Sequence, residues 1–291
     1  MSWSARRRRQ KSVGSPIERR STRPLDFPLS AVSHEGHASL SAQHLGVQVG
    51  TRTLVRDLSF DIAPGEFVAI LGRNGSGKTL TLHTLAGLRP PSGGTVLMEG
   101  MPLARMGRRA VARQAGFLAQ DLEDAFVTTV LESVLIGRHP HLSLWEWESD
   151  ADEQAAHRAL SAVDMSALSG RMTDTLSGGE RRRVAIASLL AQDPAVFLLD
   201  EPTNHLDPHH QLAVLSLFRE LADSGRAVIA TLHDPTLAAR FADRALLLSG
   251  DGSWSAGPVA EQLTAARLSE LYVTPVLEIQ HPGGHRVFVP E

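Results

Sequence analysis

The chain has 291 residues, which suits one large domain or one domain plus a subdomain, and its 42% hydrophobic content excludes a wholly disordered protein. It has no cysteine, which excludes disulfides, thiolate zinc sites and cysteine nucleophiles. The net charge is −3, and no uncharged apolar run approaches the ~18 residues that span a bilayer. Any membrane role must therefore come through a partner.

The first 36 residues form a basic segment, with eight arginine and lysine side chains against three acidic ones. The segment is rich in serine and proline and lacks hydrophobic periodicity, so residues 1–36 are predicted to be a disordered tail. No apolar stretch follows its arginines, which argues against a secretory signal. A solvated extension is the favoured interpretation, and attraction to anionic lipid or RNA is the alternative.

The first predicted elements are strands. Alternating residues over 39–62 indicate antiparallel strands, and a turn at 63–66 follows them. The apolar run 67–71 is typical of a strand buried on both faces of a parallel sheet. Helical apolar spacing covers 80–88, and a strand is predicted at 95–98.

The second half of the chain alternates predicted helices and strands. Residues from about 126 to 185 are predicted to be helical, followed by a buried strand at 195–199. A helix is predicted at 211–221 and further strands at 227–232 and 245–248. The order predicts a mostly parallel α/β core interrupted by a helical insertion.

A glycine-rich loop lies between the strand at 67–71 and the helix at 80–88. It matches the phosphate-loop pattern G-x-x-x-x-G-K-[ST]. Its glycines let backbone N–H groups face phosphates, and the following helix directs its positive end at them. Lys78 is placed for the β- and γ-phosphates and the Thr79 hydroxyl for Mg²⁺. The candidate nucleotide-binding residues are Gly72, Arg73, Asn74, Gly75, Ser76, Gly77, Lys78 and Thr79.

Two carboxylates, Asp200 and Glu201, directly follow the buried strand at 195–199. Carboxylates are costly there unless they have a function. Asp200 is placed to hold Mg²⁺ through water, and Glu201 to polarise the attacking water as general base. A cap for the next helix is the alternative. His233 also ends a strand and can reach the γ-phosphate and that water.

A second anion-binding turn is predicted at Ser177, Gly178 and Gly179, which begin a helix. It belongs to a different lobe from the phosphate loop. Two such turns in one chain suggest a head-to-tail pair, with ATP held between one chain's loop and the other's turn. For this segment alone, an ordinary helix cap is the alternative interpretation.

These motifs occur in the order found in the nucleotide-binding subunits of ATP-binding cassette (ABC) transporters, which the chain resembles over residues 39–275. The resemblance implies a P-loop NTPase (RecA-like) fold: a mostly parallel sheet core with an antiparallel β subdomain and a helical signature subdomain at about 121–185. It divides the chain into the tail, an ABC ATP-binding domain at 37–275 and a short C-terminal extension at 276–291. The matching elements are the loop 72–79, Gln120, the signature 176–180, Asp200-Glu201, Asn204-His205-Leu206-Asp207 and His233.

The resemblance also implies residue roles, with ATP and Mg²⁺ as cofactors. The signature residues would cap the γ-phosphate of ATP held by the opposite protomer, and Asp207 would link the two sites. Val49 stands where many members stack an aromatic ring on the adenine, so it offers only an apolar face. The implied catalytic residues are Glu201, His233, Lys78 and Gln120, and the implied metal-binding residues are Thr79, Gln120 and Asp200.

Two segments refine the resemblance. Residues 136–141 (I-G-R-H-P-H) resemble the GR-x-P segment of ATPases that energise import of iron-siderophores, haem and cobalamin, and residues 257–276 resemble the end of that subfamily. His139 and His141 flank a proline, which favours a structural or partner-contact role over metal binding.

This resemblance implies an importer subunit: a homodimer with a membrane permease, acting indirectly with a substrate-binding protein, on the cytoplasmic face of the cell membrane. An exporter or another importer ATPase is an alternative. A soluble ABC ATPase acting on nucleic acid or ribosomes is another, against which the single phosphate loop argues, so no nucleic acid partner is expected.

Overall fold

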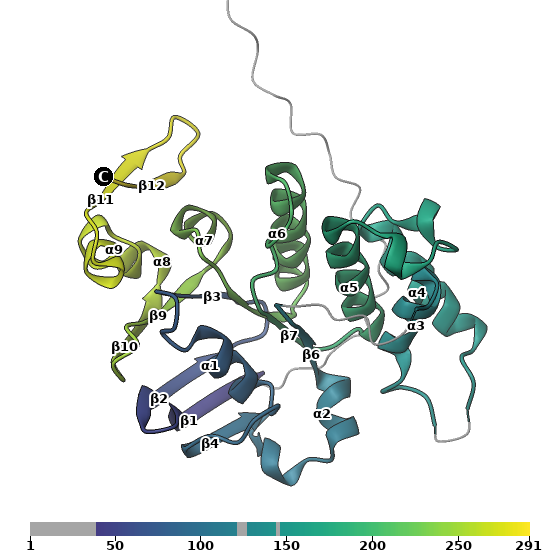
Figure 1. The fold of residues 1–291 in the computed structure, drawn as a ribbon. Coiled ribbons are helices and arrows are strands. Elements are labelled where there is room, and N and C mark those ends of the chain that lie inside the picture. Colours follow the sequence, from purple (N-terminus) through teal and green to yellow (C-terminus); the bar gives the residue numbers. More distant parts are fainter. Residues whose placement is uncertain (1–38, 121–126, 144–145) are drawn as a thin grey trace, which may run out of the picture.

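The fold is taken from a computed structural model, which describes residues 39–120, 127–143 and 146–291 (Figure 1). The predicted tail at 1–36 lies outside the described residues. A four-stranded antiparallel sheet runs in the order β2 (Arg52–Ile62), β1 (Leu40–Val49), β4 (Gly93–Met98) and β5 (Met101–Pro102). This sheet confirms the antiparallel strands predicted over 39–62.

A six-stranded sheet forms the centre of the molecule. Five of its strands are parallel, and only the edge strand β10 is antiparallel to its neighbour. A separate hairpin joins β11 (Val276–Gln280) to β12 (Arg286–Pro290). The central order is β10 (Trp254–Pro258), β9 (Arg244–Leu248), β3 (Phe67–Gly72), β8 (Ala227–Thr231), β7 (Val196–Leu199) and β6 (Ala115–Leu118).

Helices cover both faces of the central sheet and continue into a helical lobe (Figure 1). The α-helices are α1 (Lys78–Leu85), α2 (Arg108–Gln114), α3 (Val130–Leu135), α4 (Asp150–Ala162), α5 (Gly178–Gln192), α6 (Pro208–Asp223), α7 (Pro235–Phe241), α8 (Val259–Gln262) and α9 (Ala265–Tyr272). Short 3₁₀ turns are η1 (Leu103–Arg105), η2 (Ile136–Arg138), η3 (Ser166–Leu168) and η4 (Thr173–Thr175).

Strand β3 is buried on both faces, and its alternate side chains enter two separate cores. Phe67, Ala69 and Leu71 pack with helices α3 to α7, whereas Val68 and Ile70 pack with α1 and the antiparallel sheet. Period-2 alternation of side chains produces this division. Helices α1 and α5 therefore lie on opposite faces of the central sheet.

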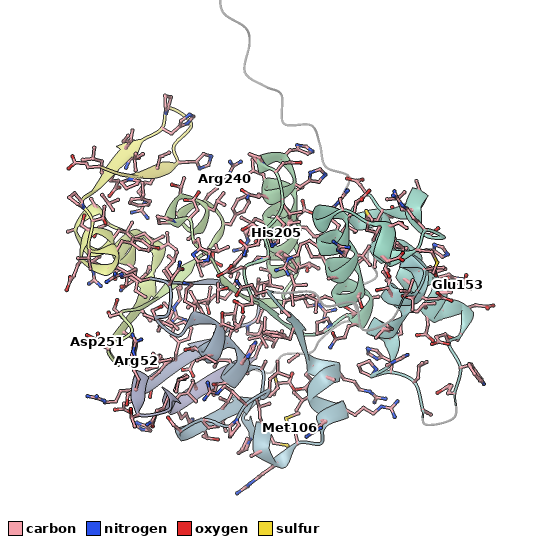
Figure 2. The ribbon with its side chains drawn as sticks, in the orientation of Figure 1. Arg52, Met106, Glu153, His205, Arg240 and Asp251 are labelled. Carbon is pink, nitrogen blue, oxygen red and sulfur yellow. The ribbon has the colours of Figure 1, made fainter. Side chains whose placement is uncertain are left out.

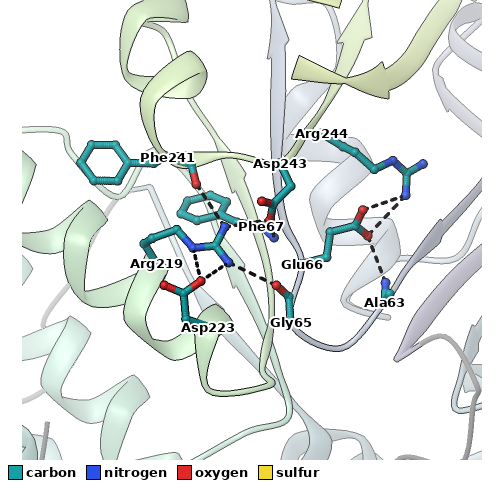
Figure 3. A network of polar contacts seen from close by, with 9 residues as sticks. All are labelled: Ala63, Gly65, Glu66, Phe67, Arg219, Asp223, Phe241, Asp243 and Arg244. Atoms are coloured by element: carbon teal, nitrogen blue, oxygen red, sulfur yellow. Dashed lines mark hydrogen bonds and ion pairs between the residues drawn. The ribbon is translucent and has the colours of Figure 1, made fainter. Parts of the chain in front are cut away.

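A polar network fixes the beginning of β3 (Figure 3). Arg219 of α6 donates to the carbonyl of Gly65 at 3.2 Å and to Asp243 at 2.7 Å. The same Asp243 carboxylate accepts from the Phe67 amide at 2.8 Å. Burial alone would lower the pKa of Arg219, but the Asp243 and Asp223 carboxylates outweigh it and raise that pKa. The network anchors the strand that leads into the phosphate loop.

The predicted helical region consists of several short helices. It contains α3, α4 and the start of α5, separated by three 3₁₀ turns and loops. Helix α5 continues past residue 185 to Gln192. Tertiary packing explains this extension, because Ala187, Leu189 and Leu190 of α5 are buried in the core. Among the described residues, no helix is long and apolar enough to cross a membrane.

Candidate active site

The phosphate loop connects β3 to α1 and depends on glycine at two positions. A Cβ on Gly72 would lie 2.5 Å from the Leu248 carbonyl oxygen, so only glycine permits this approach. Gly77 has a φ of 101°, which glycine adopts without steric cost, and it caps α1 without a side-chain hydrogen bond. The first N–H groups of α1 therefore have no side-chain cap and are suited to an anion.

Lys78 crosses the phosphate loop. It is only 6% exposed, and its ammonium group donates to the carbonyls of Gly72 at 2.9 Å and Arg73 at 3.3 Å. Burial lowers the pKa of Lys78, while the negative charges of Glu201 and Asp200 oppose that shift. The predicted lysine and carboxylates thus share one electrostatic environment.

Asp200 is fully buried at the end of β7. One carboxylate oxygen, Oδ1, accepts a hydrogen bond from the Thr231 hydroxyl at 2.7 Å. The other oxygen, Oδ2, is buried with no hydrogen-bond partner in the structure. A buried carboxylate oxygen without a donor suits a hydrated Mg²⁺ ion, which prefers oxygen ligands.

Glu201 follows Asp200 with its backbone in the left-handed region, at φ 48°. This unusual conformation is supported by a hydrogen bond from the Glu201 amide to the Thr231 hydroxyl at 2.8 Å. The carboxylate is contacted by His233 Nε2 at 2.5 Å and by the Asn204 side-chain amide. The His233 side chain is 48% exposed, whereas the Glu201 side chain is 8% exposed, so the histidine is the solvent-accessible member of this pair.

Arg182 of α5 joins the strand ends to the helical lobe. Its guanidinium is 2% exposed and donates to backbone carbonyls on both sides of the site. The carbonyls of Asp200 and Glu201 each accept at 2.7 Å. The carbonyls of Ala119, Gln120 and Pro202 also accept from it.

The signature turn begins α5 with a reciprocal cap. Ser177 accepts a hydrogen bond from the Glu180 amide, and the Glu180 carboxylate accepts from the Ser177 amide at 2.8 Å. Those contacts with Ser177 lower the pKa of Glu180. A Cβ on Gly179 would lie 3.4 Å from the carbonyl oxygen of His205, which Figure 2 labels. The turn therefore packs against the loop that precedes α6, across the sheet from α1.

The remaining predicted residues lie around this centre. Gln120 is half-buried two residues beyond β6, beside the first of residues 121–126, which lie outside the described residues. Val49 ends β1 and is 50% exposed. In the phosphate loop, Arg73, Asn74 and Gly75 are exposed, Ser76 is buried and Thr79 is half-buried.

Sequence reasoning missed two residues that organise this site. Thr231 contacts both carboxylate-bearing residues, and Arg182 holds the backbone beneath them. Both have a weak signal in the sequence. Thr231 is a polar residue inside a buried strand, and Arg182 is one of three consecutive arginines after the signature.

Comparisons with known proteins show the family of this chain. Residues 55–204 match the ABC transporter family. The chain is 40% identical over 253 residues to the hemin import ATP-binding protein HmuV of Methylobacillus flagellatus, covering 84% of this chain and 93% of that protein. It is 36% identical over 258 residues to the ferric enterobactin transport ATP-binding protein FepC of Escherichia coli, covering 88% and 95%.

Solved structures give the same result. An inward-facing ABC transporter of the metal-chelate type superposes with a TM-score of 0.76 at 31% identity, covering 88% of this chain and 98% of the solved one. A dimeric ATP-binding cassette bound to ADP and Pi superposes with a TM-score of 0.66 at 25% identity, covering 76% and 98%.

Proposed function

Because this chain belongs to the ABC transporter family and is a transport ATPase of that family, we propose that it powers import of a metal chelate, either haem or an iron-siderophore. The observation that carries the catalytic part is the convergence of Lys78, Asp200, Glu201 and His233 at the carboxyl edge of β3, β7 and β8. The cargo class is supported by the names of relatives that match most of the chain.

The phosphate loop and Lys78 would bind the ATP phosphates. Lys78 already lies across the loop on two carbonyl oxygens, so its charge is held where phosphate oxygens would arrive. Thr79, Gln120 and Asp200 would hold Mg²⁺, and the unpartnered Asp200 Oδ2 fits that role. Bound there, Mg²⁺ would neutralise charge on the phosphates.

Glu201 would accept the proton of the attacking water. Its two carboxylate oxygens are fixed by His233 and Asn204, which limits the orientations available to the base. The His233 side chain is 48% exposed, so its imidazole would also be accessible to the γ-phosphate. These two residues then act together on one water molecule and one phosphate.

ATP-binding cassettes of this family form dimers, as in the solved ADP-bound relative. For this chain we infer a head-to-tail homodimer, because α1 and α5 lie on opposite faces of the same sheet. Ser177, Gly178 and Gly179 would then contact the nucleotide on the partner's phosphate loop. Val49 would offer an apolar surface to the adenine.

The dimer would bind a membrane permease at the cytoplasmic face of the cell membrane. It would act on a substrate-binding protein only indirectly, through that permease. The test is purification of the tagged chain from detergent-solubilised membranes, combined with uptake of radiolabelled haem and ferric siderophore in cells carrying the wild type or Glu201→Gln. Co-purification of a polytopic membrane protein and loss of uptake in the variant support the proposal. Recovery of ribosomes or nucleic acid, with unchanged uptake, would overturn it.

A further inference from the structure

The β1–β2 hairpin carries Arg52 directly opposite Val49. These two residues form the last pair of the antiparallel register, on either side of a turn that contains Gly50 at φ 56°. Side chains of directly opposite residues lie on the same face of an antiparallel pair. Val49 is 50% exposed and Arg52 is also exposed, so a ligand can reach both side chains.

The Arg52 guanidinium is held next to the phosphate loop. Its Nη2 atom donates to the carbonyl oxygen of Gly250 at 2.9 Å, in the turn that follows β9. A Cβ on Gly250 would lie 3.5 Å from this Nη2 atom and 2.9 Å from the Cα atom of Ser76 in the phosphate loop. Arg52 and Ser76 therefore both border Gly250. Figure 2 labels Arg52 beside Asp251, the residue that follows Gly250.

A second contact joins the same strand to the phosphate loop. A Cβ on Gly77 would lie 3.0 Å from the Cβ atom of Leu54, which is two residues beyond Arg52 in β2. Gly77 immediately precedes Lys78 and α1, where the nucleotide phosphates are expected to bind. A nucleotide whose phosphates lie on this loop can therefore extend its base toward the end of the β1–β2 hairpin.

The arginine side chain has the chemistry that a contact with a nucleobase requires. A guanidinium group is planar, and its faces stack on aromatic rings while its edge forms hydrogen bonds. The bond to Gly250 uses only the edge, so it fixes the position of the Arg52 guanidinium without using its faces. The neighbouring Val49 side chain is apolar and has no planar group.

We propose that the base of ATP stacks on the Arg52 guanidinium in this chain. This stacking supplies the contact that an aromatic side chain at position 49 would make, and Val49 adds apolar surface beside it. Because every nucleobase has a π face, the contact strengthens binding with little preference for adenine over guanine. The inference rests on the proposed function, since it requires ATP on the phosphate loop.

Equilibrium binding to the full-length protein tests this contact. The ligands are non-hydrolysable analogues of ATP and GTP, each with Mg²⁺, and inorganic tripolyphosphate, which has phosphates but no base. We expect Arg52→Ala to raise the Kd of both nucleotide analogues at least about fivefold and to leave the Kd of tripolyphosphate unchanged. Arg56→Ala is the matched control, because Arg56 is also exposed on β2 and borders Gly252 in the turn that contains Gly250. This control should bind all three ligands as wild type does.

Two further substitutions separate stacking from charge and from the hydrogen bond to Gly250. Arg52→Lys keeps a positive charge and a donor for that carbonyl but has no planar group, so it should weaken analogue binding as Arg52→Ala does. Arg52→Tyr removes the charge but keeps a flat face, so it should retain most of the affinity. Melting temperatures without ligand, compared with wild type, show that each variant folds.

Several outcomes would overturn the proposal. Wild-type affinity for the nucleotide analogues in Arg52→Ala would show that Arg52 does not contact the base. An equal loss for tripolyphosphate would indicate a role in shaping the phosphate loop, and full affinity in Arg52→Lys would indicate charge or the Gly250 bond instead of stacking. A loss for the ATP analogue alone would indicate hydrogen bonding to the adenine edge. If wild-type protein binds none of the three ligands, the proposed function fails together with this inference.

Discussion

His233 Nε2 and Glu201 Oε1 lie 2.5 Å apart, although 32 positions separate these residues in the chain. The contact exists because β7 and β8 are neighbouring parallel strands, so their carboxyl ends meet at one edge of the sheet. The phosphate loop leaves β3 at the same edge, next to β8. Strand order therefore brings the lysine, the carboxylates and the histidine together.

Replacing Glu201 with glutamine should stop turnover while preserving ATP binding. The amide keeps the shape of the carboxylate, but it has only one acceptor oxygen and cannot accept a proton from water. We expect kcat to fall by about 10²–10⁴-fold. Steady-state hydrolysis and fluorescent-nucleotide binding measure the two effects. The exposed Glu153→Gln change on α4 is the control, and near wild-type turnover in E201Q would exclude Glu201 as the base.

A change at Thr231 tests whether its hydroxyl positions Asp200 and Glu201. Thr231→Val removes the hydroxyl that donates to Asp200 and accepts from the Glu201 amide, leaving buried polar groups unpaired. We expect the free energy of unfolding to fall by about 1–3 kcal/mol and kcat to fall as well. Thr231→Ser should retain both properties. Urea denaturation and hydrolysis rates decide the result, and equal behaviour of Val and Ser variants would contradict it.

Arg182→Met should destabilise the fold. The change leaves five backbone carbonyls without their guanidinium donor in a buried region. We expect a loss on the order of 3 kcal/mol in the free energy of unfolding. The neighbouring Arg181→Met is the matched control, since Arg181 is only half-buried. Equal stability of these two variants would show that the carbonyl contacts of Arg182 contribute little.

We expect the Asp152 carboxylate to make a pH-dependent contribution to the free energy of unfolding. Burial alone would raise the pKa of Asp152, but hydrogen bonds from Ser149 and Arg138 outweigh it and lower the pKa from 3.8 to about 2. The folded state therefore favours the ionised form, so this stabilisation is present above about pH 4 and is lost as the pH falls toward 2.

Asp152→Asn should lower the free energy of unfolding by about 2 kcal/mol at pH 7, and the difference from wild type should shrink between pH 4 and 2. Urea denaturation at several pH values measures this. Asp150→Asn, on the exposed first turn of α4, should show a much smaller difference. A pH-independent effect of the Asp152 change would contradict the assignment.

Mixing two inactive proteins tests the head-to-tail dimer. Lys78→Ala damages the phosphate loop and Ser177→Arg damages the signature turn, so neither protein alone should hydrolyse ATP. A mixed head-to-tail dimer has one site with both defects and one intact site. We expect hydrolysis to return on mixing. If each site were completed within one chain, no activity would be regained, and each variant mixed with itself is the control.

Much of the site could be predicted from sequence, because its motifs are local. Gly72 to Thr79 form one continuous segment, from the end of β3 to the first turn of α1, whose backbone conformation requires glycine, and the signature turn caps its own helix. The buried strands were also predictable, since their apolar runs have few alternative structures. The resemblance to ABC transporters rests on such local patterns and was confirmed by the comparisons.

Other features depend on contacts between distant segments, which one sequence does not encode in a readable form. The sequence does not distinguish Arg182 from Arg181 and Arg183. In the folded protein Arg182 is buried, and its guanidinium donates to five backbone carbonyls. The hairpin at β11 and β12 forms because Phe288 packs into the core and its amide binds Thr236. The sequence alone determined the chemistry of each motif. Only the tertiary structure decided which motifs meet, because strand order and the two faces of the sheet set those distances.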